Sequence, residues 1–189
     1  MKFINNVNET LRDDIAAEMK KGSKLSIAAA YFSIYAFEAL RKELSNIDEL
    51  RFIFTDPTFI QKENSKKEKR EFYIPKLNRE RGIYGTEFEV KLRNELNQKA
   101  IAKECAEWIK KKVTFKSNVG NKDITDKFIL LDDKAYFPVN GFTTVDLGCE
   151  QGNNMGTNIA KVASPMSLTL IEQFEKLWQN NEELKDVTD

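Results

Sequence analysis

The sequence predicts an α/β protein whose mixed β-sheet carries helices on both faces. In the first third of the chain, amphipathic helical segments alternate with short apolar segments, which is the order expected of a sheet with right-handed crossovers. Further along, the apolar runs 128–131 and 135–139 flank an acidic pair and predict a β-hairpin. Because both runs are continuously apolar, we expect each strand to be covered on both faces.

The N-terminal third predicts two helices between its strands. Asn8 precedes apolar residues at four-residue spacing, so it is the expected N-cap of a helix that ends at Gly22. Ser33 is the expected cap of the second helix, and the alanines before it predict that a helix packs closely on the preceding strand. The expected strands are 3–4 at an edge, 24–32 in the centre and 50–55 after the second helix.

Two further helices are expected in the second half of the chain. The apolar residues of 97–112 fall on one helical face, with Trp108 expected in the core. Ser164 and Pro165 are residue types preferred at the cap and first position of a helix, whose apolar face extends to Trp178. The expected strands here, besides the hairpin, are 113–116 and 159–162.

The composition limits the possible partners. Lysine and arginine total 30, as do aspartate and glutamate, so any nucleic-acid surface must be a local patch. The two cysteines, Cys105 and Cys149, are far apart and are expected to be reduced thiols, since no signal peptide is recognisable. No apolar run approaches the ~20 residues that cross a bilayer. We therefore expect a soluble, cytoplasmic chain with no membrane partner.

No cofactor and no metal site are expected from the motifs. The sequence has no Walker A motif, no cluster of zinc ligands and no glycine-rich dinucleotide turn after a strand. The acid pairs Asp13–Asp14 and Asp132–Asp133 are of a type that can bind a divalent ion, but adjacent acids in turns and on helix faces are usually solvated, and we expect that here.

One window carries motif-level detail. Thr125-x-Lys127-x4-Asp132 resembles the histidine-x-lysine-x4-aspartate signature of the phospholipase D-like superfamily, with lysine and aspartate at the same spacing. Thr125 stands where the family has its nucleophilic histidine, and the chain contains no histidine at all. The family's glycine-serine-x-asparagine turn has only a poor counterpart, residues 138–141. The helix–strand–helix–strand opening also resembles phospholipase D-like domains fused to the front of bacterial superfamily-II helicases.

The resemblance implies a fold without the family's chemistry. In the family a histidine attacks phosphorus, a second histidine protonates the leaving group, and two motifs combine, so this chain would need a homodimer to complete a site. The hydroxyl of Thr125 has a pKa far above neutrality and no histidine to activate it. Loss of proton transfer by the second histidine alone costs a factor of roughly 10²–10⁴. We therefore expect a catalytically degenerate domain, with an active phosphodiesterase as the remote alternative.

The binding half of such a site is retained in the sequence. Lys127 can meet a phosphate as a point charge, and Asp132 can orient it. Thr125 and Thr143 can add hydroxyl donors. Basic residues interleaved with aromatics in 62–85 form a second candidate surface for DNA or RNA. The basic candidates there are Lys66, Lys67, Lys69, Arg70, Arg79 and Arg81. Two alternatives remain open: a solvated insertion, and a purely structural pair of Lys127 with Asp132 or Asp126.

The expected organisation is one domain with two additions. Residues 1–178 form the phospholipase D-like domain and contain the basic insertion 62–85. Residues 179–189 form an acidic tail or a linker to a following helicase motor. The alternative is a structural or dimerisation module in which the sheet is only a scaffold.

Overall fold

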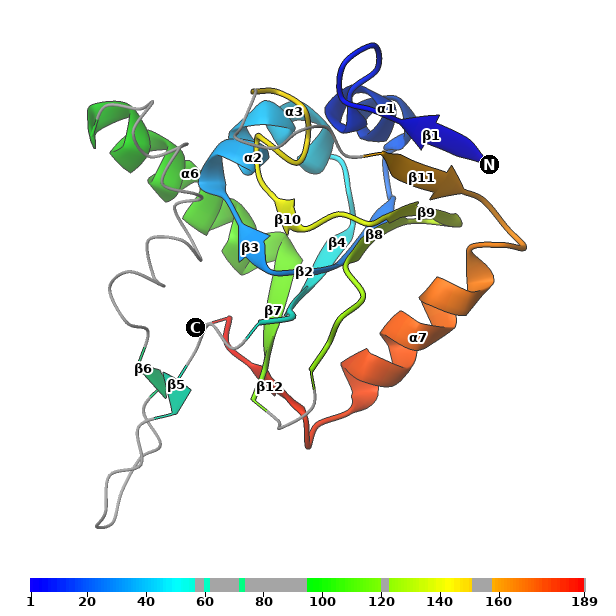
Figure 1. The fold of residues 1–189 in the computed structure, drawn as a ribbon. Coiled ribbons are helices and arrows are strands. Elements are labelled where there is room, and N and C mark those ends of the chain that lie inside the picture. The colour runs from blue at the N-terminus through cyan, green and yellow to red at the C-terminus, as the bar shows by residue number, and fades with distance from the viewer. Residues whose placement is uncertain (57–59, 62–71, 74–94, 120–122, 151–157, 189) are drawn as a thin grey trace.

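The computed structural model describes residues 1–56, 60–61, 72–73, 95–119, 123–150 and 158–188 (Figure 1). In these residues the chain forms an eight-stranded mixed sheet and five helices, which confirms the predicted α/β class. Most of the basic insertion 62–85 lies outside the described residues.

The eight strands follow the order β1-β11-β9-β8-β2-β4-β7-β12 across the sheet. Strands β2, β4 and β7 are parallel, and each of the other strands runs antiparallel to its neighbours. Their bounds are β1 Lys2–Ile4, β2 Lys24–Ala29, β4 Glu49–Phe54, β7 Val113–Asn118, β8 Phe128–Leu131, β9 Lys134–Phe137, β11 Ile159–Val162 and β12 Leu184–Asp186.

Two small sheets accompany the main one. Strand β3 (Tyr31–Phe32) pairs in parallel with β10 (Gly141–Phe142), and β5 (Ile60–Gln61) pairs with β6 (Phe72–Tyr73). The expected strand 24–32 is therefore divided: Ala30 N–H donates to the carbonyl of Asn140, and the chain leaves the main sheet there.

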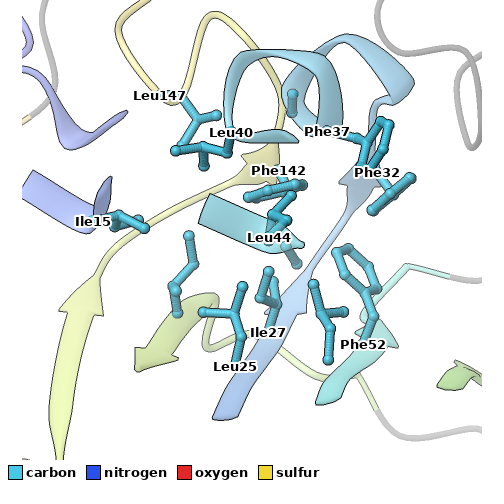
Figure 2. Packing of buried hydrophobic residues seen from close by; sticks show 14 of the residues in the cluster. Ile15, Leu25, Ile27, Phe32, Phe37, Leu40, Leu44, Phe52, Phe142 and Leu147 are labelled. Carbon is cyan, nitrogen blue, oxygen red and sulfur yellow. The ribbon is translucent and has the colours of Figure 1, made fainter. Parts of the chain in front are cut away.

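The helices cover the two faces of the sheet unequally. Their bounds are α1 Leu11–Glu18, α2 Ile34–Ala39, α3 Arg41–Leu44, α6 Glu95–Lys112 and α7 Leu168–Gln179. Alternate strand residues point to opposite faces: Ile27 joins a core with α1, α2, α3 and α6, whereas Ala28 joins a second core with Phe174 of α7. Figure 2 shows the larger core. Trp108 is buried there as predicted.

Three boundaries differ from the predicted ones. Thr10, not Asn8, caps α1, because its side chain accepts from the Asp13 N–H. Helix α7 begins at Leu168, since residues 164–167 form a turn and not the first turn of the helix. Strand β12 lies within the segment expected as a tail or linker and pairs with β7 at the edge of the main sheet. The sheet thus extends beyond residue 178.

Two further helix limits also differ: α1 ends at Glu18 and not at Gly22, and the second predicted helix is divided at Leu40 into α2 and α3. Other expectations for these segments agree with the structure. Ser33 caps α2 by accepting from the N–H groups of Tyr35 and Ala36. The hairpin forms with its turn at the acidic pair, and both cysteines are free thiols. None of the helices in the described ranges is long and apolar enough to cross a membrane.

Candidate functional site

The motif window places Lys127 at the carboxyl ends of the parallel strands. Strand β8 runs antiparallel to β2 with Phe128 opposite Ala28, so Lys127 lies beside the end of β2. Strand β4 ends next to it, with Thr55 N–H donating to the carbonyl of Ala29. In open α/β sheets, ligands bind in the region outside the carboxyl ends of the strands. We call this region, defined by Ala29, Thr55, Asp56 and Lys127, the carboxyl edge.

The Lys127 side chain is loosely held at the carboxyl edge. Its Nζ lies 3.7 Å from Oδ1 of Asp56, and the side chain is 25% exposed. A separation of 3.7 Å is longer than a hydrogen bond, and partly exposed pairs of this kind contribute at most about 1 kcal/mol. In the described part of the chain, Lys127 forms no other ion pair. Its ammonium can therefore turn towards an incoming anion at small cost.

Neither of the two structural pairs considered for Lys127 forms. Asp126 accepts instead from Nε2 of Gln173 on α7, at 2.8 Å. Asp132 lies at the other end of β8, and five strand residues at ~3.3 Å each place it roughly 16 Å from Lys127. Asp56, which sequence spacing could not connect with Lys127, is the actual partner.

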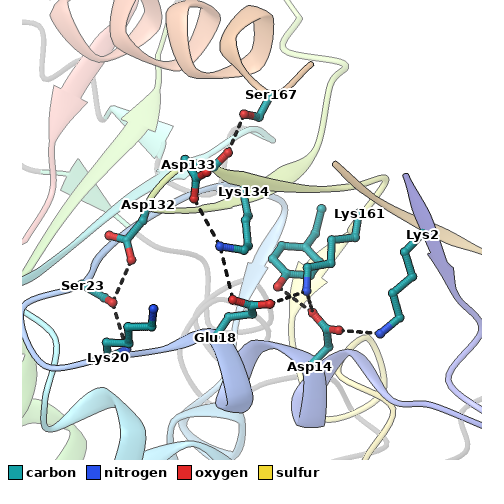
Figure 3. Close-up of polar contacts among 11 residues, drawn as sticks. Lys2, Asp14, Glu18, Lys20, Ser23, Asp132, Asp133, Lys134, Lys161 and Ser167 are labelled. Carbon is teal, nitrogen blue, oxygen red and sulfur yellow. Dashed lines mark hydrogen bonds and ion pairs between the residues drawn. The ribbon is translucent and has the colours of Figure 1, made fainter. Parts of the chain in front are cut away.

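Asp132 anchors the hairpin to the start of β2 (Figure 3). Its two oxygens accept from the hydroxyl of Ser23 at 2.8 Å and from the backbone N–H of Lys24 at 3.0 Å. Its φ of +51° places it in the left-handed region that the tight turn between β8 and β9 uses. Lys127 and Asp132 therefore lie at opposite ends of β8 and do not form one site.

The two threonine candidates differ in accessibility. Thr125 is exposed in the segment that precedes β8. Thr143 is fully buried: its hydroxyl donates to Oδ2 of Asp146 at 2.6 Å and accepts from the backbone N–H of Asp146. This geometry argues against a direct contact between Thr143 and a ligand.

The loop that carries Thr143 is packed tightly beside the end of β2. A Cβ added to Gly141 would lie 3.2 Å from Cβ of Tyr31 and 3.0 Å from Oδ2 of Asp146, closer than ordinary contacts. The close packing of Gly141 thus fixes this loop against Tyr31 and Asp146.

The described charges near Lys127 are predominantly acidic. Asp56 is its ion-pair partner, and Asp123 and Asp126 precede it in the chain. The predicted basic residues Lys66, Lys67, Lys69, Arg70, Arg79 and Arg81 lie outside the described residues, so the structure does not place them relative to Lys127.

A partly buried charge network joins α1 to the hairpin side of the sheet (Figure 3). Asp14, expected to be solvated, is buried and accepts from Lys161 Nζ at 2.7 Å, Tyr136 Oη at 2.8 Å and Lys2 Nζ at 2.9 Å. Glu18, one turn further along α1, accepts from Lys161 and is paired with Lys134. Asp14 and Asp13 are adjacent, but helix geometry turns only Asp14 towards the sheet.

The network controls the ionisation of its members. Burial raises the pKa of Asp14, but hydrogen bonds from Lys161, Lys2 and Tyr136 lower it by more, so the pKa lies below its ordinary value. Burial, together with the hydrogen bond to Asp14, raises the pKa of Tyr136 well above its ordinary value. Tyr136 therefore remains a protonated donor at neutral pH, and we interpret the network as structural.

Comparison with known proteins adds no family. The chain matches no protein-family model and no curated protein. The described residues contain no group of three or more His, Cys, Asp or Glu side chains placed to hold a metal ion.

Proposed function

We propose that this chain is a catalytically inactive phospholipase D-like domain that binds the phosphate backbone of DNA or RNA, as an accessory domain of a helicase-like protein. The observation that carries the proposal is the position of Lys127. It is a partly exposed lysine at the carboxyl edge, and its ion pair with Asp56 is longer than a hydrogen bond. The proposed ligand contact replaces Asp56 by a phosphate oxygen.

The order of the elements supports the family assignment. After β1 the chain continues with α1, then β2 and β3 ending in Tyr31-Phe32-Ser33, and then α2, α3 and β4. Apart from β1 and the division of the second helix, this is the order that the resemblance implies. The motif-bearing strand β8 lies next to β2 in the middle of the sheet. Lys127 and Asp132 occupy its two ends.

The proposal excludes the family's reaction for this chain. Thr125 cannot act as the nucleophile without a base, and the sequence offers no histidine for that role or for the general acid. A homodimer of the family's kind would bring a second Lys127 towards the same phosphate chain, so it would strengthen binding without restoring catalysis.

The basic insertion is the second part of the proposed interface. Lys66, Lys67, Lys69 and Arg70 lie close together in the sequence, as do Arg79 and Arg81. Each phosphate contact made by such a side chain releases counterions and steepens the salt dependence of binding. We propose that these residues supply the positive charge that the acidic surroundings of Lys127 lack.

The test is binding of a fluorescent DNA duplex and a fluorescent single strand across a salt series. Lys127→Ala should weaken binding and reduce the slope of log K against log salt by about 1. Lys103→Ala is the matched control, because Lys103 is exposed on α6 and has no ion-pair partner among the described residues. Identical curves for Lys127→Ala, Lys103→Ala and wild type would refute a contact at Lys127.

A third variant separates the two parts of the interface. The triple variant with Lys66, Lys67 and Lys69 changed to alanine should have a lower affinity for DNA, independently of Lys127→Ala. If only this variant weakens binding, the nucleic-acid site lies in the insertion. If no form of the protein binds DNA or RNA at low salt, the sheet is a scaffold and the proposal fails.

A further inference from the structure

Three chain segments meet at the opposite edge of the sheet, where the parallel strands begin. The segment before β2 is bonded to the segment before β4, through Gly22 N–H to the Asn46 carbonyl and Asp48 N–H to the Ser23 carbonyl. The end of α6 is bonded to the same segment, because Nζ of Lys112 donates to the carbonyls of Ser45, at 2.7 Å, and Ile47, at 2.6 Å. These bonds hold 20–24, 45–49 and 110–112 together as one surface.

Exposed lysines gather on this surface, which we call the amino edge. They are Lys20, Lys21, Lys24, Lys110 and Lys111. Of these five lysines, only Lys24 forms an ion pair within the described part of the chain, with Glu49 at 3.5 Å. The other four ammonium groups have no ion-pair partner in the described structure. An unpaired lysine at the surface is available to an external anion without first breaking an internal contact.

The acids of the amino edge leave this positive charge largely uncompensated. Glu49 is already paired with Lys24, and Asp132 accepts from Ser23 and from a backbone N–H. Asp48 and Glu107 are exposed, and neither comes within ion-pair distance of a lysine here. The chain as a whole has no net charge. A local excess of lysines of this kind still creates a positive field on one side of the molecule.

Stabilisation of helix ends does not account for all of these lysines. Lysines in the last turn of a helix complement its dipole, and Lys110, Lys111 and Lys112 all lie in the last turn of α6. Lys112 also donates to the carbonyls of Ser45 and Ile47. Lys20 and Lys21 follow the end of α1 by two and three residues, in a turn whose geometry depends on Gly22 at φ +85°. A turn of this kind needs the glycine but places no demand on the charge of Lys20 or Lys21.

We infer that the amino edge is a second polyanion-binding surface and that its partner is the phosphate backbone of a nucleic acid. The large apolar side chains exposed in the described structure are Met1, Phe3, Val7, Met166 and Leu168, and none belongs to the three segments. A membrane-binding surface combines lysines with apolar side chains that enter the lipid, whereas backbone binding to nucleic acid requires the charges alone. The inference stands apart from the proposed contact at Lys127, since the two surfaces lie at opposite ends of the strands.

The experiment compares three double variants in the full chain. Lys20→Ala/Lys21→Ala and Lys110→Ala/Lys111→Ala remove charge from the two sides of the amino edge. Lys99→Ala/Lys103→Ala removes the same charge from exposed positions earlier on α6 and serves as the control. Binding of a labelled duplex is measured by fluorescence anisotropy from low to physiological salt, and thermal unfolding followed by circular dichroism verifies that each variant is folded.

Each amino-edge variant should bind more weakly, and the salt slope should fall by roughly 0.9 for each phosphate contact removed, so by about 1.8 where both lysines touch the backbone. The control variant should retain the wild-type slope. Equal losses in all three variants, or none in either amino-edge variant, would overturn the inference. So would amino-edge variants that bind DNA normally but lose binding to phosphatidylserine vesicles, since that result identifies a membrane surface.

The same data separate this inference from the proposed function. If Lys127→Ala leaves the curves unchanged while the amino-edge variants weaken binding, the amino edge is the nucleic-acid surface and the carboxyl edge is not. If only Lys127→Ala weakens binding, the amino-edge inference is wrong and the proposed function stands.

Discussion

Lys127 and Asp132, five positions apart in the sequence, have different surroundings at the two ends of β8. Lys127 is partly exposed at the carboxyl edge, and Asp132 holds the far end of β8 against the start of β2. Sequence spacing predicted that both would matter but assigned both to one site. The partner that decides the state of Lys127 is Asp56, which is distant in sequence and is brought close only by the pairing of β2 with β4 and β8.

Asp132→Ala should therefore destabilise the fold without affecting a ligand at Lys127. The change removes the acceptor for Ser23 and Lys24 and puts alanine at a positive φ, which together should lower the free energy of unfolding by about 1–3 kcal/mol. Urea denaturation measures this loss. Asp133→Ala is the control: within the described residues, the Asp133 side chain forms only a surface ion pair, with Lys134, so we expect a change within about 0.5 kcal/mol.

At the scale of elements, strand β12 completes the sheet on the β7 side. Leu184 is buried in the core beneath α7, and Val187 N–H donates to the carbonyl of Phe115. Helix α7 is itself fixed on the sheet by Arg51, which forms two hydrogen bonds to Glu175 and lies over the rings of Phe174 and Trp178. The C-terminal segment thus contributes to the folded body in the way a core strand does.

Leu184→Ala tests this role of β12. Truncation of a fully buried leucine leaves a cavity and should lower the free energy of unfolding by about 2–4 kcal/mol. Lys185→Ala, at the next position and exposed, should change it by less than about 0.5 kcal/mol. Equal, small effects in a thermal or urea melt would mean that 179–189 behaves as a tail and not as part of the sheet.

The spacing of apolar residues predicted most helices and strands, because their apolar faces extend over several residues. The strands of the hairpin and the helix ending at Lys112 follow directly from such patterns. Strand β12 was missed because only one of its three residues is buried, so it offers no alternation to detect. The start of α7 was misplaced because Ser164 and Pro165 satisfy the cap preferences locally, whereas residues 164–167 form a turn and the helix begins only at Leu168.

For the candidate site, the sequence predicted that Lys127 is a candidate phosphate ligand and that it lies directly before the strand β8. The sequence could not show that Thr143 is buried, because its burial depends on how the loop packs. Nor could it show that Asp14 is the centre of a network, because its partner Tyr136 is more than a hundred residues away in the sequence. In the sequence, nothing distinguishes Tyr136 and Lys161 from other strand residues. Their contact with α1 follows only from the positions of β9 and β11 in the sheet.

At the scale of the whole molecule, ion pairs connect the helices α1 and α7 to the sheet. Protonation of their carboxylates at low pH should weaken these ion pairs. Hydrogen bonds from Lys161 lower the pKa of Glu18, and those from Arg51 lower the pKa of Glu175, while the pKa of Asp14 is also lowered. A carboxylate with a lowered pKa in the folded state stabilises the fold above its unfolded pKa. That stabilisation is lost as the pH falls through the lowered folded pKa.

The free energy of unfolding should accordingly be highest near neutral pH and fall as the pH drops below about 5, where unfolded carboxyl groups begin to bind protons. Asp14→Asn should lower stability at pH 7 by about 2–4 kcal/mol and flatten the acid dependence, because Lys161 loses a buried partner. Urea melts of both proteins at pH 7 and pH 4 measure the two effects. Parallel losses between pH 7 and pH 4 would show that Asp14 does not contribute to the acid sensitivity.

The central claim is that a phosphate replaces Asp56 as the partner of Lys127, and a double-mutant cycle on DNA affinity tests it most directly. Asp56→Asn removes the competing carboxylate and should strengthen binding in the wild-type background, while in the Lys127→Ala background it should have a clearly smaller effect. The difference between the two effects is the coupling between the residues. An equal gain in both backgrounds would mean that Asp56 acts only through general charge and that Lys127 does not contact the backbone.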